Sequence, residues 1–158
     1  MYVVLVLIVA LALLLLLALV GYGWLAVRNQ RRTLIALRRT GVAFLCRPRM
    51  GLRRFAGFIL SVDGEAVSLW RVGLGRPMRR QTFASAGAQV TPATVRINTA
   101  RSSAGLSVLS SGGERVDVVV YPDPTMSYSA PADGAVLDLV QEKIRETLPP
   151  VPRRPEVP

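Results

Sequence analysis

Residues 2–27 read YVVLVLIVALALLLLLALVGYGWLAV, and no side chain in this stretch is charged. As an α-helix the stretch would be about 39 Å long, at about 1.5 Å per residue. The hydrocarbon core of a bilayer is about 30 Å thick, so such a helix can span it with some tilt. Tyr2, Tyr22 and Trp24 lie near its ends, where aromatic rings favour the membrane interface. We therefore expect a transmembrane anchor over residues 1–27.

Two other interpretations of this segment are open. A cleaved signal peptide would start with basic residues and have a shorter apolar run, whereas this chain starts Met-Tyr and stays apolar through Leu13 to Leu17. A buried core helix of a soluble protein is the third interpretation. The length of the segment and its lack of charge favour a true span.

Arginines follow the apolar segment at once, and a continuing helix would gather them on one arc of about 120°. They are Arg28, Arg31, Arg32, Arg38 and Arg39. Because basic residues stay on the cytoplasmic side of a span, we expect a single-pass protein of the cell membrane with its C-terminal domain in the cytoplasm. Residues 28–40 are expected to form a basic juxtamembrane helix, which anionic lipid would attract by about 1 kcal/mol per charge. The alternative is that these charges only set the topology.

The remaining charge agrees with this placement. The net charge is +10, and most of the basic residues precede residue 81. Cys46 is the single cysteine, so it has no internal disulfide partner, as expected in a reducing compartment.

Residues 41–148 are expected to form a β-rich domain that ends in a helix. Candidate strands are Val42 to Cys46, Phe55 to Val62, Ala66 to Val72, Arg79 to Phe83, Val90 to Asn98, Leu106 to Leu109 and Arg115 to Tyr121. Asp63-Gly64 predicts a hairpin with a type I′ turn, in which both central residues have positive φ. Residues 111–114, Ser-Gly-Gly-Glu, predict a second turn, and residues 99–105 a loop.

A helical pattern follows over about residues 132–148, where Leu137, Val140, Ile144 and Leu148 recur at helical spacing. Residues 149–158 form a Pro-rich tail that we expect to be disordered. The predicted fold class is an N-terminal transmembrane helix plus a small α+β domain, in which a curved antiparallel sheet or barrel is followed by a C-terminal helix. This element order also suggests a pleckstrin-homology-like barrel.

Several short motifs point to one family. They are Cys46-Arg47, Gly57, Val62-Asp63-Gly64, Leu69-Trp70-Arg71-Val72, Arg76-Pro77 and Arg79-Arg80. Together they resemble an actinobacterial family of short membrane proteins, domain-of-unknown-function family 2550. The resemblance implies the same layout of one span, a basic stretch, a hairpin and a late helix, and it implies no activity. The chain departs from the family at Leu69, where a second aromatic residue is usual, and in its late helix, which has no aromatic side chain.

The sequence offers little for catalysis. It contains no histidine, which is the commonest general base and metal ligand. Cys46 lies in an apolar strand and has no histidine partner, so we expect it to be a packing residue. We expect no enzyme activity, no catalytic or metal-binding residues and no cofactor.

A basic cluster remains as a candidate binding patch. It consists of Trp70, Arg71, Arg76, Arg79 and Arg80. Guanidinium groups pair well with phosphate or carboxylate, whereas the alternative is a core Trp with solvated arginines around it. We therefore expect a membrane-anchored binding or scaffold module that docks on anionic lipid or on a membrane-protein partner. A membrane-tethered nucleic-acid-binding protein is the alternative, although no nucleic-acid-binding motif is present.

Overall fold

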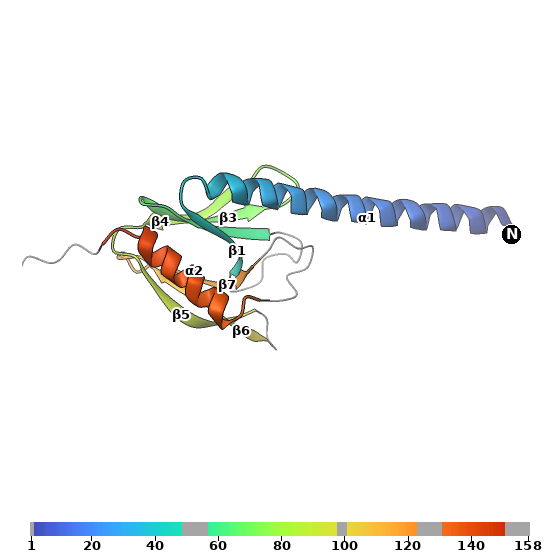
Figure 1. Ribbon diagram of the computed structural model, residues 1–158. Coiled ribbons are helices and arrows are strands. Elements are labelled where there is room, and N and C mark those ends of the chain that lie inside the picture. The colour runs from blue at the N-terminus through green and yellow to red at the C-terminus, as the bar shows by residue number, and fades with distance from the viewer. Residues whose placement is uncertain (1, 49–56, 98–100, 123–130, 151–158) are drawn as a thin grey trace, which may run out of the picture.

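The computed structural model describes residues 2–48, 57–97, 101–122 and 131–150. The elements are α1 (Tyr2–Leu37), β1 (Val42–Pro48), β2 (Gly57–Val62), β3 (Ala66–Val72), β4 (Met78–Ala84), β5 (Gln89–Arg96), β6 (Ser102–Leu109), β7 (Arg115–Tyr121) and α2 (Gly134–Thr147). The predicted fold class is confirmed: a long apolar helix precedes a curved antiparallel sheet and a C-terminal helix (Figure 1). The predicted strand ends at Phe55 and Asn98 lie outside the described residues, as do residues 151–158 of the tail.

The seven strands form one sheet in the order β4-β3-β2-β1-β7-β6-β5, with antiparallel neighbours throughout. β4 and β5 are its two edges, yet only residues 85–88 join them. The sheet must therefore curve until its edges approach each other at that end. Gly87 makes this link possible with a φ of 71°, which favours glycine. The pleckstrin-homology-like comparison stays a prediction.

The concave face of the sheet packs around one core, and α2 closes it. Phe44, Phe58, Leu60 and Leu106 are among the buried side chains of this core. Leu137 and Ile144 of α2 complete it, as the helical spacing predicted. α2 begins at Asp133, whose carboxylate accepts a hydrogen bond from the Val136 N–H at 2.9 Å and so caps the helix.

The other face of the sheet is covered by the last turns of α1. Leu34 is buried there in one cluster with side chains of β1, β2, β3, β5 and β7, and Leu37 packs against this cluster. α1 is one continuous helix that contains the expected anchor and most of the expected basic helix, but it ends at Leu37, so the predicted end at residue 40 is wrong and Arg38 and Arg39 lie in the turn that follows. The helix is 36 residues long, or about 54 Å, and its N-terminal part projects away from the domain (Figure 1). β1 consequently has a helix on each of its faces.

A tight corner joins α1 to β1. The Arg38 Nε donates to the Ala43 carbonyl oxygen at 3.0 Å, and the Thr40 N–H donates to the Leu37 carbonyl at 3.2 Å. Gly41 follows, and a Cβ at this position would collide with the Val62 carbonyl oxygen at the end of β2. The corner therefore fixes the direction of α1 relative to the sheet.

The structure corrects two local predictions. The β2–β3 hairpin is present, but Gly64 does not have a positive φ, so the predicted type I′ turn is wrong. The Asp63 Oδ1 accepts the N–H groups of Glu65 and Ala66 at 2.9 and 2.6 Å, and the Ser85 hydroxyl donates to the Gly64 carbonyl at 2.8 Å, which together impose another conformation. The predicted loop over residues 99–105 is partly wrong as well, because β6 begins at Ser102 rather than Leu106.

A side chain at Gly64 would meet nothing within 4 Å, so valine there is not strained in the way a type I′ turn implies. The second predicted turn is confirmed: Gly113 has a φ of 86°, and its N–H donates to the Ser110 carbonyl at 3.1 Å.

Candidate binding surface

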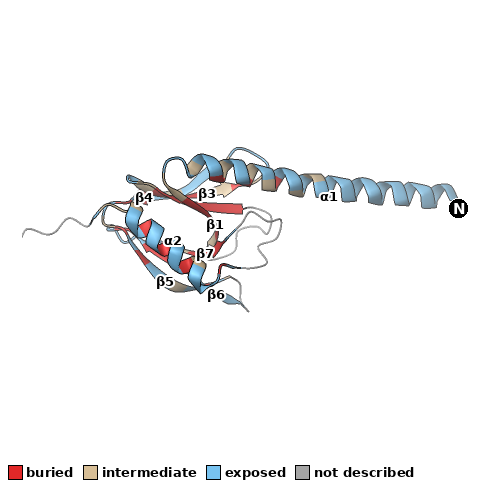
Figure 2. Ribbon diagram, in the orientation of Figure 1, coloured by how far each residue is buried: buried red, intermediate tan, exposed pale blue. Residues whose placement is uncertain are grey.

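Most of the uncharged part of α1 is exposed in the described structure. Its large apolar side chains are exposed from Tyr2 to Leu25, and burial against the sheet begins at Ala26 (Figure 2). Within the described part of the chain, α1 is the one helix long and apolar enough to cross a membrane. Its junction with the domain is therefore the place where a membrane surface would lie.

Asn29 ties the domain to this junction. Its Nδ2 donates to the carbonyl oxygens of Gly73 and Gly75, at 2.6 and 2.9 Å. These glycines lie in residues 73–77, which connect β3 and β4 and which we call the β3–β4 loop. These two hydrogen bonds hold the loop against the first charged turns of α1. Leu74, which lies between the two glycines, is 49% exposed.

The five arginines predicted for the basic helix all have exposed side chains, three of them on α1 and two, Arg38 and Arg39, in the turn that follows it. Two of them also make contacts within the chain. The Arg28 guanidinium lies 5.1 Å from the centre of the Trp24 ring, and the Arg38 Nε makes the corner bond to Ala43. Arg38 therefore stabilises the corner between α1 and β1, a role that its expected function as a topology signal did not predict.

The candidate patch on β3 and β4 divides between two faces of the sheet. Trp70 lies opposite Ile59 on β2 and Arg79 on β4, and it packs with the cluster under α1. Arg71 lies opposite Phe58 and therefore on the other face, because directly paired residues of antiparallel strands share a face. The patch does not form one continuous surface.

Trp70 has the contacts of a packing residue. It is partly buried, and its Nε1 donates to the Ser61 hydroxyl at 3.0 Å. The Arg79 guanidinium covers the ring at 4.7 Å from its centre. The alternative of a core Trp with arginines around it therefore fits Trp70, while Arg76 and Arg80 are exposed.

A hollow of about 270 Å³ opens where the loop meets the helix. Leu25, Arg28, Asn29 and Arg32 line it from α1, and Leu74 lines it from the loop. Arg28 and Arg32 thus share a surface with the β3–β4 loop, although each of them is more than forty positions from Leu74 in the sequence.

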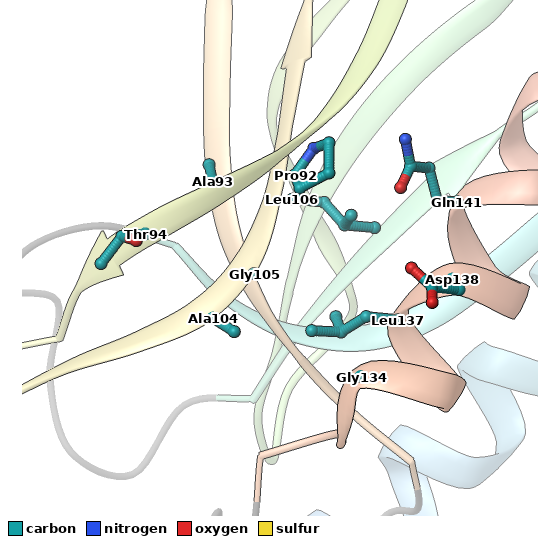
Figure 3. A pocket seen from close by; sticks show the side chains of 10 residues that line it. All are labelled: Pro92, Ala93, Thr94, Ala104, Gly105, Leu106, Gly134, Leu137, Asp138 and Gln141. Carbon is teal, nitrogen blue, oxygen red and sulfur yellow. The ribbon is translucent and has the colours of Figure 1, made fainter.

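A second concavity lies between α2 and the edge of the sheet, with a volume of about 380 Å³. Figure 3 shows Pro92 and Leu106 of the strands facing Leu137 and Gln141 of the helix. The Gln141 Nε2 lies 3.5 Å from the Val90 carbonyl oxygen, on the open edge of β5. Backbone groups alternate along a strand, so Pro92 faces the same edge and offers no N–H there. This edge is poorly suited to receive an added strand.

The potentially reactive groups are held inside the domain. Cys46 is fully buried in the concave core, and burial raises the pKa of its thiol well above the ordinary value, so it stays protonated. Burial also raises the pKa of Tyr121, an effect that the nearby Arg47 guanidinium opposes. Among the described residues, no group of three or more His, Cys, Asp or Glu side chains is placed to hold a metal ion.

Comparisons with protein families, with curated proteins and with solved structures gave no match. The resemblance to family 2550 therefore stays a prediction.

Two residues of this surface were missed by the sequence analysis, Asn29 and Leu74. Each is an ordinary residue in its local context: an amide beside arginines, and a leucine between two glycines. Their importance comes from a contact between α1 and the β3–β4 loop, and no local pattern encodes it.

Proposed function

We propose that this chain is a non-enzymatic, membrane-anchored binding module whose domain lies on the cytoplasmic side and docks on the anionic surface of the membrane that α1 spans. The orientation is supported by the arginines that follow the uncharged segment. Cytoplasmic leaflets carry anionic lipids, which attract basic segments next to a span.

One observation carries this proposal: the hydrogen bonds of Asn29 to Gly73 and Gly75. Through them the β3–β4 loop lies beside the last part of the uncharged helix, and it brings exposed Leu74 and Arg76 with it. An exposed apolar side chain among arginines is typical of surfaces that enter the headgroup region of a bilayer. A loop fixed in this way would meet the membrane whenever α1 spans it.

The distribution of acidic residues also supports docking of the domain through the end that carries Asn29 and the β3–β4 loop. Asp63 and Glu65 lie at the opposite end of β3 from the loop. α2 has Asp138, Glu142 and Glu146 on its exposed surface, and it packs on the other face of the sheet from α1. An anionic surface would therefore be attracted to the α1 end and would meet little repulsion there.

Nucleic acid would be attracted by the same charges, so it is kept as a competing outcome. The location favours lipid, because the exposed arginines of α1 begin at the end of the uncharged segment, where lipid phosphates are the nearest anions. A membrane-protein partner is a further outcome of the same test.

The test compares the full chain in nanodiscs of phosphatidylcholine alone with nanodiscs that also contain phosphatidylglycerol. We expect phosphatidylglycerol to slow hydrogen exchange in the β3–β4 loop and to do so less as salt rises above about 0.15 M. Replacing Arg76, Arg79 and Arg80 together by Gln should reduce this protection. The matched control replaces Arg115, Lys143 and Arg145, which are exposed residues of β7 and α2, and should retain it.

Equal exchange in both kinds of nanodisc would contradict docking on anionic lipid. Tight binding of a DNA or RNA fragment to the protein in phosphatidylcholine nanodiscs would favour the nucleic-acid alternative. Protection that appears only in native membranes, and that a crosslinked protein accompanies, would favour the protein partner.

A further inference from the structure

We propose that the hollow between α1 and the β3–β4 loop is a binding site for the headgroup of one anionic phospholipid. This inference rests on the proposed function and makes it specific: it names the residues and the chemical group that they bind. Arg28 and Arg32 supply the charge, and Leu25 and Leu74 supply the apolar wall.

The two arginines are spaced to act together. Residues four apart on a helix lie on the same face, about 5–6 Å apart at Cβ. Each guanidinium presents a planar set of N–H donors that matches the oxygens of a phosphodiester. None of the described residues that line the hollow is Asp or Glu, so none of them neutralises the charge of the two arginines.

Asn29 has a positioning role in this site. Its Nδ2 has two hydrogens, and both are committed to the carbonyls of Gly73 and Gly75. It therefore donates nothing to the ligand through that atom. What it does is hold Leu74 opposite Leu25, and without that contact the hollow would lose one wall.

The depth of the hollow fits a lipid better than a free anion. Arg28 is the first residue of the chain with a charged side chain, and it follows Trp24 by four residues, or about 6 Å along the helix. Trp24 belongs at the interface, so Arg28 and Arg32 would lie at the level of lipid phosphates. Leu25 and the 49% exposed Leu74 would face the glycerol and the first methylenes of the same lipid.

The experiment counts phosphatidylglycerol molecules bound to the detergent-solubilised full chain by native mass spectrometry. The variant Arg28→Gln/Arg32→Gln should bind the first lipid about tenfold more weakly or worse, the loss expected for charge-assisted hydrogen bonds. The matched control, Arg31→Gln/Arg39→Gln, removes the same charge from α1 and from the turn that follows it, outside the hollow, and should stay within about threefold of the parent chain.

A second pair of variants leaves the charge unchanged. Leu74→Ser should weaken binding of the first lipid, whereas Leu139→Ser, a similarly exposed leucine at 52% on α2, should not. Both changes are at exposed positions, so the domain should remain folded, and circular dichroism of each variant checks this.

The outcomes separate the site from the wider proposal. Equal losses in both arginine pairs would overturn the site and leave charge-driven docking intact. Equal binding of phosphatidylglycerol and phosphatidylcholine by the parent chain would overturn both. Displacement of the lipid by inorganic phosphate at similar concentration would show that the hollow binds free anions, and would overturn the assignment to a lipid.

Discussion

The Nδ2 of Asn29 lies 2.6 Å from the carbonyl oxygen of Gly73, a contact between residues 44 positions apart. This hydrogen bond joins α1 to the β3–β4 loop. We expect Asn29→Leu, which keeps the size and loses the donors, to speed hydrogen exchange of residues 73–77 about tenfold, since each hydrogen bond contributes about 1 kcal/mol.

The control for this prediction is Thr33→Val on the same helix. It removes the bond from the Thr33 hydroxyl to the Asn29 carbonyl, at 2.9 Å, and touches no loop residue. If Asn29→Leu exchanges like the parent chain, the loop is held by something other than these two bonds.

Glycine at position 41 should be essential, and glycine at position 64 should be replaceable. A Cβ at Gly41 would collide with the Val62 carbonyl and lie 3.0 Å from the Asp63 Cα, both of them backbone atoms. We expect Gly41→Ala to lower the free energy of unfolding by about 1–3 kcal/mol. Gly64→Ala meets nothing within 4 Å and should change it by less than about 0.5 kcal/mol. Thermal melts of the two variants test this, and similar losses would mean that the α1–β1 corner is not tightly packed.

The domain should need the last turns of α1 in order to fold. A chain that begins at Gly23 keeps Ala26, Leu34 and Leu37, whereas one that begins at Gly41 leaves the cluster under α1 without its cover. Burial of a single leucine contributes about 1.5–3 kcal/mol, a large share of a total of about 5–15 kcal/mol. We expect a cooperative urea transition for the longer chain and aggregation or a broad transition for the shorter one. Equal stability would mean that α1 only rests on the sheet.

Stability should fall at alkaline pH because of Cys46. Burial raises its folded pKa, so the folded chain keeps a proton that the unfolded chain releases above about pH 8.5. The stabilisation is complete below that pH and declines above it, by up to about 1.4 kcal/mol per pH unit. Tyr121 acts in the same direction but from about pH 10. Denaturant titrations between about pH 8 and 10 should show this slope in the parent chain, and Cys46→Ala should be less stable but flatter. An identical slope in both would exclude the thiol as its source.

The orientation of the domain relative to the membrane can be measured by labelling an introduced cysteine. Cys46 is fully buried and should not react with a maleimide in the folded protein, so an added thiol reports alone. We expect Glu142→Cys, at an exposed position of α2, to be labelled only after the membrane is permeabilised. Labelling in intact cells would place the domain outside and contradict the proposed docking on the cytoplasmic leaflet.

Part of the fold could be predicted from the sequence because it depends on local residue chemistry. β3 and β7 have the predicted ends, since each is an apolar run bounded by turn residues. Other elements depended on partners. Ser102 to Gly105 has little strand propensity, yet it is in β6 because it pairs with β5, and a Cβ at Gly105 would collide with the Val118 carbonyl. Asp63-Gly64 predicted the hairpin but not its turn, because Ser85, which follows β4, also bonds there.

The sequence by itself determined that a long uncharged helix precedes a cluster of arginines, and that a β-rich domain with a final helix follows. The length of an apolar segment, its charge and its residue periodicity are local properties, and they do not depend on the rest of the chain. Only the tertiary structure decided which arginines lie together. It divided Trp70 and Arg71 between two faces through strand pairing, and it joined Arg28 and Arg32 to Leu74 through Asn29. These relationships come from packing between segments distant in the sequence, and the free energy of such packing depends on every surface that meets there.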